Sequence, residues 1–180
     1  MEVPHVKLPA GDVVIGANGI VLREWMVADI QAMVTLFDED SIDVWTPLES
    51  PFDAAAAQRY LERAYRLRAQ GHGIQLAITT DGRAPLGEVL LFDGDSPDTG
   101  ELAYAVGIAH RGQGLAARAV RMVMTFAADH CGLSRYLLTI SPANLASQAV
   151  ARAAGFRQSD EPITIRERKG RRLQMATWRC

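Results

Sequence analysis

The segment between residues 101 and 140 constrains the fold of this sequence more than any other. It reads as a strand (ELAYAVGIA), a glycine turn, a helix (LAARAVRMVMTFAADH) and a second strand (RYLLTI). The helical run has apolar residues at the spacing of one helix face. The second strand is almost entirely apolar, which is typical of a strand buried on both faces. Because two strands joined through a helix lie parallel with a right-handed crossover, the sequence predicts an α/β fold with a parallel pair.

Hydrophobic periodicity predicts further strands and helices on both sides of this unit. Asp53 is a good N-cap for the helix that follows it, and Asp81-Gly82 is a turn that would join two strands. The predicted strands are residues 19–23, 74–80, 85–93, 101–109, 135–140, 156–161 and 173–179, and the predicted helices are residues 29–38, 54–71, 115–130 and 146–155. Residues 38–53 are expected to form a loop or a broken helix. We predict an N-terminal arm at residues 1–18 and a single domain at residues 19–180, with the element order βααβββαβαββ.

Composition and charge exclude several classes of protein. The 180 residues are 48% hydrophobic and 22% charged, as in a soluble globular domain. A net charge of −2 provides no basic surface for nucleic acid, and no apolar run approaches the roughly 18 residues of a membrane span. Two cysteines are too few for a disulfide framework, which favours the cytoplasm. The four histidines are scattered, so no metal site is expected.

The glycine turn, from His110 to Ala117, follows a strand and opens a helix. Small residues let the backbone approach a ligand closely. The first amides of a helix have no partner within the helix, and the helix dipole adds positive potential. The turn is therefore predicted to bind an anion, above all a phosphate, with Arg111 as an added cation.

Gly112-x-Gly114-x-x-Ala117 also matches the fingerprint of dinucleotide-binding folds. Those folds place the motif early in a doubly wound sheet and carry an acidic residue at the end of the next strand to hold a ribose. Here the turn lies in the middle of the chain, and the next strand leads into Ser141-Pro142 with no acidic residue. The context therefore argues against a dinucleotide site.

Two short motifs stand out: Arg111-x-x-Gly114-x-Ala116 in the glycine turn, and the later Asn144-x-x-Ser147 followed by Gly155-Phe156. Together they resemble the pyrophosphate motif and the second signature of the GCN5-related N-acetyltransferase (GNAT) superfamily. The resemblance covers residues 19–179, because the element order also agrees. Trp45-Thr46-Pro47 and the late Leu173-x-Met175-x-x-Trp178 look most like the branch that acetylates the N-termini of ribosomal proteins. The implied fold is α/β (α+β): a mixed, mostly antiparallel sheet with a central splayed parallel strand pair and flanking helices.

The resemblance implies acetyl-coenzyme A (acetyl-CoA) as a co-substrate and no metal. In the family the pantetheine arm lies between the splayed strands, where it would meet the backbone of Ala105 and Val106. The amides that would hold the pyrophosphate belong to Arg111, Gly112, Gln113, Gly114, Leu115 and Ala116. Asn144 would contact the pantetheine, and it is equally well placed to cap the following helix.

The same resemblance implies direct attack of an amine on the thioester. Only a neutral amine attacks, so a base helps. Glu101 occupies the strand position of a base glutamate in histone-acetylating relatives, or else it is a solvated residue at the start of a strand. Ser147 would lie near the sulfur and protonate the leaving thiolate. Many relatives use a tyrosine after the second motif for this step, and this sequence has none after Tyr136. The acidic residues of the 38–43 segment would attract a cationic amine or form a solvated loop.

Two functions are open at this point. The first is an N-acetyltransferase that moves the acetyl group of acetyl-CoA to a primary amine, on a protein N-terminus or a small molecule. The second is a non-catalytic acyl-CoA-binding sensor or partner-binding domain. Glu101 and Ser147 favour the enzyme. The expected partners are the acceptor amine and a second copy of the chain in a homodimer, whereas nucleic acid and membrane are not expected.

Overall fold

The computed structural model describes residues 6–180, and residues 1–5 of the predicted arm lie outside this range. One sheet holds its strands in the order β1-β2-β3-β4-β5-β6-β9-β7, and β8 pairs with β9. The strands are β1 (Val14–Ala17), β2 (Ile20–Glu24), β3 (Gly73–Thr79), β4 (Gly87–Asp93), β5 (Thr99–Val106), β6 (Arg135–Ile140), β7 (Arg157–Gln158), β8 (Thr164–Arg168) and β9 (Arg171–Arg179). The helices are α1 (Ile30–Phe37), α2 (Asp40–Trp45), α3 (Ala54–Ala69), α4 (Leu115–Cys131) and α5 (Leu145–Ala154), with 3-10 turns η1 (Val27–Asp29) and η2 (Ile108–His110).

Antiparallel pairing dominates the sheet, and β5 and β6 form the predicted parallel pair. The register of this pair runs only from Thr99 and Arg135 to Glu101 and Leu137. Beyond these residues, the described strands continue without pairing with one another, β5 to Val106 and β6 to Ile140. The pair is therefore splayed, and the edge of β5 that faces β6 presents backbone groups to the gap.

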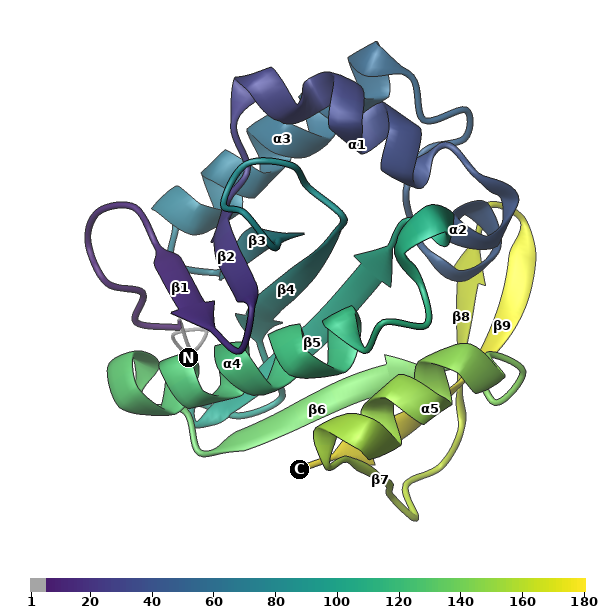
Figure 1. The fold of residues 1–180 in the computed structure, drawn as a ribbon. Coiled ribbons are helices and arrows are strands. Elements are labelled where there is room, and N and C mark those ends of the chain that lie inside the picture. Colours follow the sequence, from purple (N-terminus) through teal and green to yellow (C-terminus); the bar gives the residue numbers. More distant parts are fainter. Residues whose placement is uncertain (1–5) are drawn as a thin grey trace.

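Helices cover both faces of the sheet (Figure 1). Helices α4 and α5 lie on one face, whereas α1 and α3 lie on the other. Alternate residues of a strand point to opposite faces, so each face has its own apolar cluster. Leu76 and Val89 belong to the cluster under α4, whereas Ala77 and Phe37 belong to the cluster under α3. Because both faces are covered, β3 is buried along its whole length.

The structure confirms most of the predicted elements. Asp53 caps α3, since its Oδ1 accepts a hydrogen bond from the backbone N of Ala56 at 2.8 Å. The Asp81-Gly82 turn joins β3 to β4, and α4 follows the glycine turn as predicted. No helix among residues 6–180 is long and apolar enough to cross a membrane.

Two segments differ from the sequence prediction. Within the segment assigned to an arm, β1 pairs with β2 through the turn Asn18-Gly19, whose φ angles are 52° and 72°. This dipeptide is a strong hairpin signal, but the mostly exposed edge strand before it has no clear alternation. Residues 38–53, expected to form a loop or a broken helix, contain the short helix α2, in keeping with that prediction. The closing hairpin around Lys169-Gly170 joins β8 to β9, whereas the strand predicted at 156–161 is reduced to the two residues of β7.

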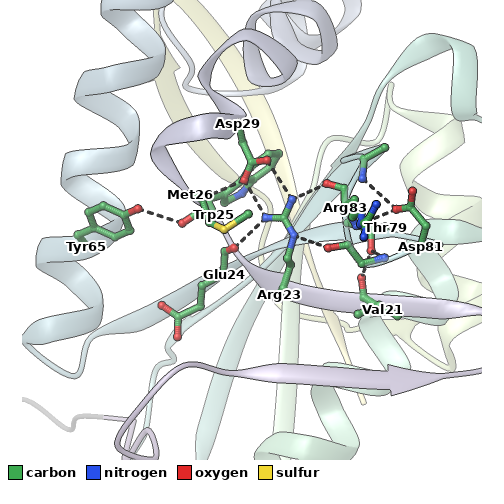
Figure 2. Close-up of polar contacts among 12 residues, drawn as sticks. Val21, Arg23, Glu24, Trp25, Met26, Asp29, Tyr65, Thr79, Asp81 and Arg83 are labelled. Carbon is green, nitrogen blue, oxygen red and sulfur yellow. Dashed lines mark hydrogen bonds and ion pairs between the residues drawn. The ribbon is translucent and has the colours of Figure 1, made fainter.

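A buried ion pair fastens the start of the domain to the sheet (Figure 2). Arg23 and Asp29 are 8% and 6% exposed, and the guanidinium donates to both carboxylate oxygens at 2.7 and 2.9 Å. Arg23 also donates to the carbonyls of Gly82 and Arg83 in the β3–β4 turn. The pair thus joins β2, η1 and that turn.

Candidate active site

The glycine turn has the backbone shape that the sequence predicts for an anion site. Gly112 and Gly114 have φ angles of 76° and 69°, in the left-handed region that favours glycine. A Cβ atom at either position would meet no atom of the described chain within 4 Å, so the space in front of the turn is open. The unpaired first amides of the 17-residue helix α4 follow directly. Together these features form a cradle for an anionic group.

A cavity of about 680 Å³ lies at this turn, between the end of β5 and the starts of α4 and α5. We call it the glycine-turn cleft. Its volume falls within the range of about 300–1,000 Å³ found for small-molecule sites. It brings together most of the predicted cofactor-binding residues and the predicted catalytic serine: Ala105, Val106, Arg111, Gly112, Gly114, Leu115, Ala116, Asn144 and Ser147. Gln113 does not line it, and its carbonyl instead accepts a hydrogen bond from Arg118.

The arginine beside the turn is already engaged. Arg111 donates from Nε to the carbonyl oxygen of Val106 at 3.0 Å, and its guanidinium forms an ion pair with Glu39. Arg118 donates to the carbonyls of Gly114 and Asn18, so it braces the turn from behind. The turn therefore presents backbone amides to the cleft, while the Arg111 guanidinium is held by a carboxylate.

A second cavity, of about 340 Å³, lies on the face of the sheet that α3 covers. We call it the sheet pocket. Its floor is made of alternate residues of β3, β4 and β5, namely Gln75, Glu88, Leu90, Phe92, Glu101, Ala103 and Ala105. The two cavities meet, because both are lined by Trp45, Thr46, Tyr104, Ala105, Asn144 and Ser147.

The C-terminal hairpin and α2 form the outer wall of the sheet pocket. Arg166, Arg168 and Met175 of the hairpin line it, together with residues 45–48 that end α2 and follow it. Lys169 at the hairpin turn pairs with Asp43 of α2 at 2.5 Å, and this hydrogen bond lowers the pKa of Asp43. Arg168 donates to the carbonyl oxygen of Trp45 at 3.2 Å. Two segments more than 100 residues apart in sequence are thus joined across the pocket.

A tyrosine that the sequence analysis did not select lies at the junction of the two cavities. The Tyr104 hydroxyl donates to the carbonyl oxygen of Ser147 at 2.8 Å and lies 2.9 Å from the Ser147 Oγ. Burial raises the pKa of Tyr104 to about 12, so the phenol stays protonated at neutral pH. The family pattern places such a tyrosine after the second motif, whereas Tyr104 lies before it, in β5. Asn144 caps α5 by accepting from the Ser147 backbone N at 3.0 Å, which confirms the capping interpretation.

Glu101 lies on the floor of the sheet pocket at the beginning of β5. Its Oε1 accepts a hydrogen bond from the Thr139 hydroxyl at 3.0 Å and lies 3.8 Å from the Arg166 guanidinium. It precedes Ala105 by four residues, which corresponds to about 13 Å along a strand. Its role as a base is not tested by this geometry and stays a prediction.

A second carboxylate, which the sequence analysis missed, lies on the same floor. Glu88 of β4 is 3% exposed, and the Tyr60 hydroxyl of α3 lies within hydrogen-bond distance of both its oxygens, at 2.8 and 3.0 Å. Burial raises the pKa of Glu88 to about 7, against the opposing effect of the Tyr60 hydrogen bond. A sequence signal existed, because a glutamate inside the apolar run GEVLLF is unusual for a buried strand. Among residues 6–180, no group of histidine, cysteine and acidic side chains could hold a metal ion.

Comparison with known proteins places the chain in a family. The family model described as the acetyltransferase (GNAT) domain matches residues 20–157, well over half of the sequence. The chain therefore belongs to the GNAT acetyltransferase family, acyl-CoA-dependent enzymes that transfer an acetyl group. No curated protein matches the sequence.

Solved structures share the fold at low sequence identity. RimJ of Mycobacterium smegmatis, in complex with CoA-disulfide, is 20% identical, with a TM-score of 0.79 over 94% of this chain and 86% of that one. RimL, a ribosomal L7/L12 alpha-N-protein acetyltransferase in complex with coenzyme A, is 16% identical, with a TM-score of 0.80 over 93% and 97% of the two chains. The microcin C7 self-immunity acetyltransferase MccE, in complex with acetyl-CoA and AMP, is 15% identical, with a TM-score of 0.77 over 89% and 91%. The resemblance to the ribosomal-protein branch thus agrees with the structural neighbours.

Proposed function

We propose that this protein is an N-acetyltransferase that transfers the acetyl group of acetyl-CoA to a primary amine by direct attack in a ternary complex. The observation that carries the proposal is the junction of two cavities of different chemistry at Tyr104, Ala105 and Ser147. The glycine-turn cleft suits a phosphate-bearing cofactor, and the sheet pocket offers carboxylates to a cation. Two substrates bound in them would meet at the junction.

The glycine-turn cleft supports acetyl-CoA as the co-substrate. Its open cradle at Gly112 and Gly114 suits the pyrophosphate. The gap between β5 and β6 suits the pantetheine arm, because unpaired strand edges form hydrogen bonds with an extended ligand. In this scheme Ala105 and Val106 supply the strand backbone and Asn144 lies beside the arm. Structural neighbours that hold coenzyme A or acetyl-CoA support acetyl-CoA as the co-substrate.

The chemistry of the junction supports transfer rather than binding alone. The tetrahedral intermediate that follows amine attack must expel a thiolate, which needs a proton or a hydrogen bond. Ser147 remains our candidate for this role, and the Tyr104 hydroxyl beside it is a second donor at the same place. Glu101, the predicted base, lines the pocket in which the amine would bind. A sensor that only bound acyl-CoA would need neither of the two carboxylates on the pocket floor.

The acceptor is proposed to be a primary amine on a protein N-terminus or a small molecule. Neighbours named as ribosomal-protein acetyltransferases support the first, and the microcin self-immunity enzyme supports the second. Both cysteines are free thiols, in keeping with the cytoplasmic location that the sequence predicts. A homodimer is retained as a prediction from the family resemblance.

The decisive experiment is a thiol-release assay with acetyl-CoA and a panel of peptides with free N-termini, diamines and amino acids, followed by mass spectrometry of the products. We expect one class of amine to gain 42 Da, about the mass of an added acetyl group, with stoichiometric release of coenzyme A. Thermal unfolding gives a parallel test, because saturation at about 100 times the dissociation constant adds about 2.7 kcal/mol of stability. Stabilisation by NAD and none by acetyl-CoA would contradict the proposal.

A further inference from the structure

Glu88 lies closer to the junction of the two cavities than Glu101, the base that the sequence predicts. The β4–β5 register pairs Glu88 directly with Ala105, which lines both cavities. Paired residues of antiparallel strands have Cα atoms about 5 Å apart. Glu101, in contrast, is separated from Ala105 by about 13 Å of strand. On the shared floor, the carboxylate nearest to the proposed thioester site is therefore that of Glu88.

The two carboxylates also differ in their partners. Glu101 accepts from Thr139 and lies near Arg166, so its charge is balanced by the hairpin. Glu88 has no ion-pair partner in the described chain within 4 Å, and its carboxylate lies beside two neutral donors, the Tyr60 hydroxyl and the Trp25 indole. A buried carboxylate without a cation is costly unless it is protonated or receives one. A cationic amine in the sheet pocket would provide that missing charge.

The charged and titratable groups that line the pocket around Glu88 come from three elements. They are Tyr60 and Arg63 of α3, Glu101 and Tyr104 of β5, and Arg166 and Arg168 of β8. The floor also holds the Gln75 amide, whose Oε1 is buried and has no hydrogen-bond partner within residues 6–180. An ammonium group, with three N–H donors, matches a floor that carries a carboxylate and an unused acceptor.

We propose that Glu88 is the catalytic base of this enzyme and accepts a proton from the acceptor ammonium, while the Tyr60 hydroxyl positions its carboxylate. This inference rests on the proposed N-acetyltransferase function. The carboxylate takes one proton of the ammonium, and the neutral amine forms a C–N bond with the acetyl carbonyl carbon. As the tetrahedral intermediate collapses, the C–S bond breaks and a second proton leaves the nitrogen. That proton ends on the coenzyme A sulfur, and Glu88 later releases its own proton to solvent.

The test compares kcat/KM from pH 6 to about 10 for the parent, E88Q, E101Q, Y60F and the control E62Q. The probes are acetyl-CoA with an N-terminal alanyl peptide, an N-terminal seryl peptide and a diamine. Glutamine keeps the size of Glu88 and removes the negative charge, and Glu62 is exposed on α3 and lines neither cavity. We expect E88Q to lose about 10²–10⁴-fold at pH 7 and to recover as pH approaches the pKa of the amine. E101Q should lose less, and E62Q should match the parent.

Y60F provides a readout that a purely structural role would not change. The Tyr60 hydrogen bond favours the charged form of Glu88, so its removal should raise the pKa of Glu88 and move the acidic limb of the profile to higher pH. An E88Q enzyme that follows the parent at every pH, or that loses the same factor at every pH, would overturn the proposal. A parent that acetylates none of the three probes would instead contradict the proposed function itself, and this inference with it.

Discussion

Replacing Glu88 with glutamine should stabilise the folded protein at neutral and alkaline pH. Glu88 has a pKa of about 7 in the folded chain, because burial disfavours its charged form, against an ordinary value of 4.5. The folded state therefore holds a proton that the unfolded state has lost between these two values. By linkage, the contribution of Glu88 to stability is most favourable below about pH 4.5, becomes less favourable as pH rises to about 7 and changes little above that.

The size of this effect follows from the same two values. A difference of one pKa unit corresponds to about 1.36 kcal/mol, so the full penalty is about 3 kcal/mol once Glu88 is ionised. For a chain of this length about 1 kcal/mol moves the melting temperature by roughly 2–4 °C, so E88Q should melt about 6–12 °C above the parent at pH 8. Near pH 4.5 the free energies of unfolding of E88Q and the parent should differ only by the pH-independent effect of replacing the carboxyl group with an amide.

The assay is urea unfolding of the parent, E88Q and E62Q at intervals from pH 4.5 to 8.5, without ligand. The stability difference between E88Q and the parent should grow with pH, whereas the exposed control E62Q should show no such growth. A difference that stays constant across this range would refute the reasoning, because it would mean that Glu88 titrates alike in the folded and unfolded chains.

Three further predictions concern other parts of the structure. Gly114→Val should abolish acetyl-CoA binding in calorimetry and cost about 1–2 kcal/mol, because a β-branched residue is strained at a φ of 69°; normal binding would remove the turn from the site. Glu39→Gln should tighten acetyl-CoA binding several-fold by releasing Arg111 from its ion pair, and an unchanged dissociation constant would contradict this. Asp29→Ala should cost about 3–5 kcal/mol in urea unfolding by leaving the buried Arg23 charge unpaired, and a loss under 1 kcal/mol would count against that account.

Local chemistry made the shape of the glycine turn and the start of α5 predictable from the sequence. The glycine turn needs residues that tolerate positive φ, and Gly112 and Gly114, two residues apart, indicate such a turn. Asn144 likewise caps the helix that begins beside it. The splayed strands followed only from the family resemblance, because no residue pattern shows where pairing between β5 and β6 stops.

The rest of the site depends on contacts between distant residues, and these could not be read from the sequence. Tyr104 and Ser147 are 43 positions apart, and Arg111 and Glu39 are 72 apart. The position of Glu88 opposite Ala105 requires the strand register, because a shift by one residue would turn it to the other face of the sheet. The sequence shows that Glu88 is a charged residue within an apolar strand, but it does not show which residues surround it.

Under the proposed function, the wall that α2 and the C-terminal hairpin form together makes acceptor choice and cofactor binding separable traits. Arg166, Arg168 and Met175 line the sheet pocket and not the glycine-turn cleft. Substitutions or length changes in this hairpin would reshape the space available to an acceptor without altering the turn at α4. Substitutions in β8 and β9, arising in evolution or by engineering, would therefore change the amine that is accepted. The ion pair between Lys169 and Asp43 would keep the hairpin against α2.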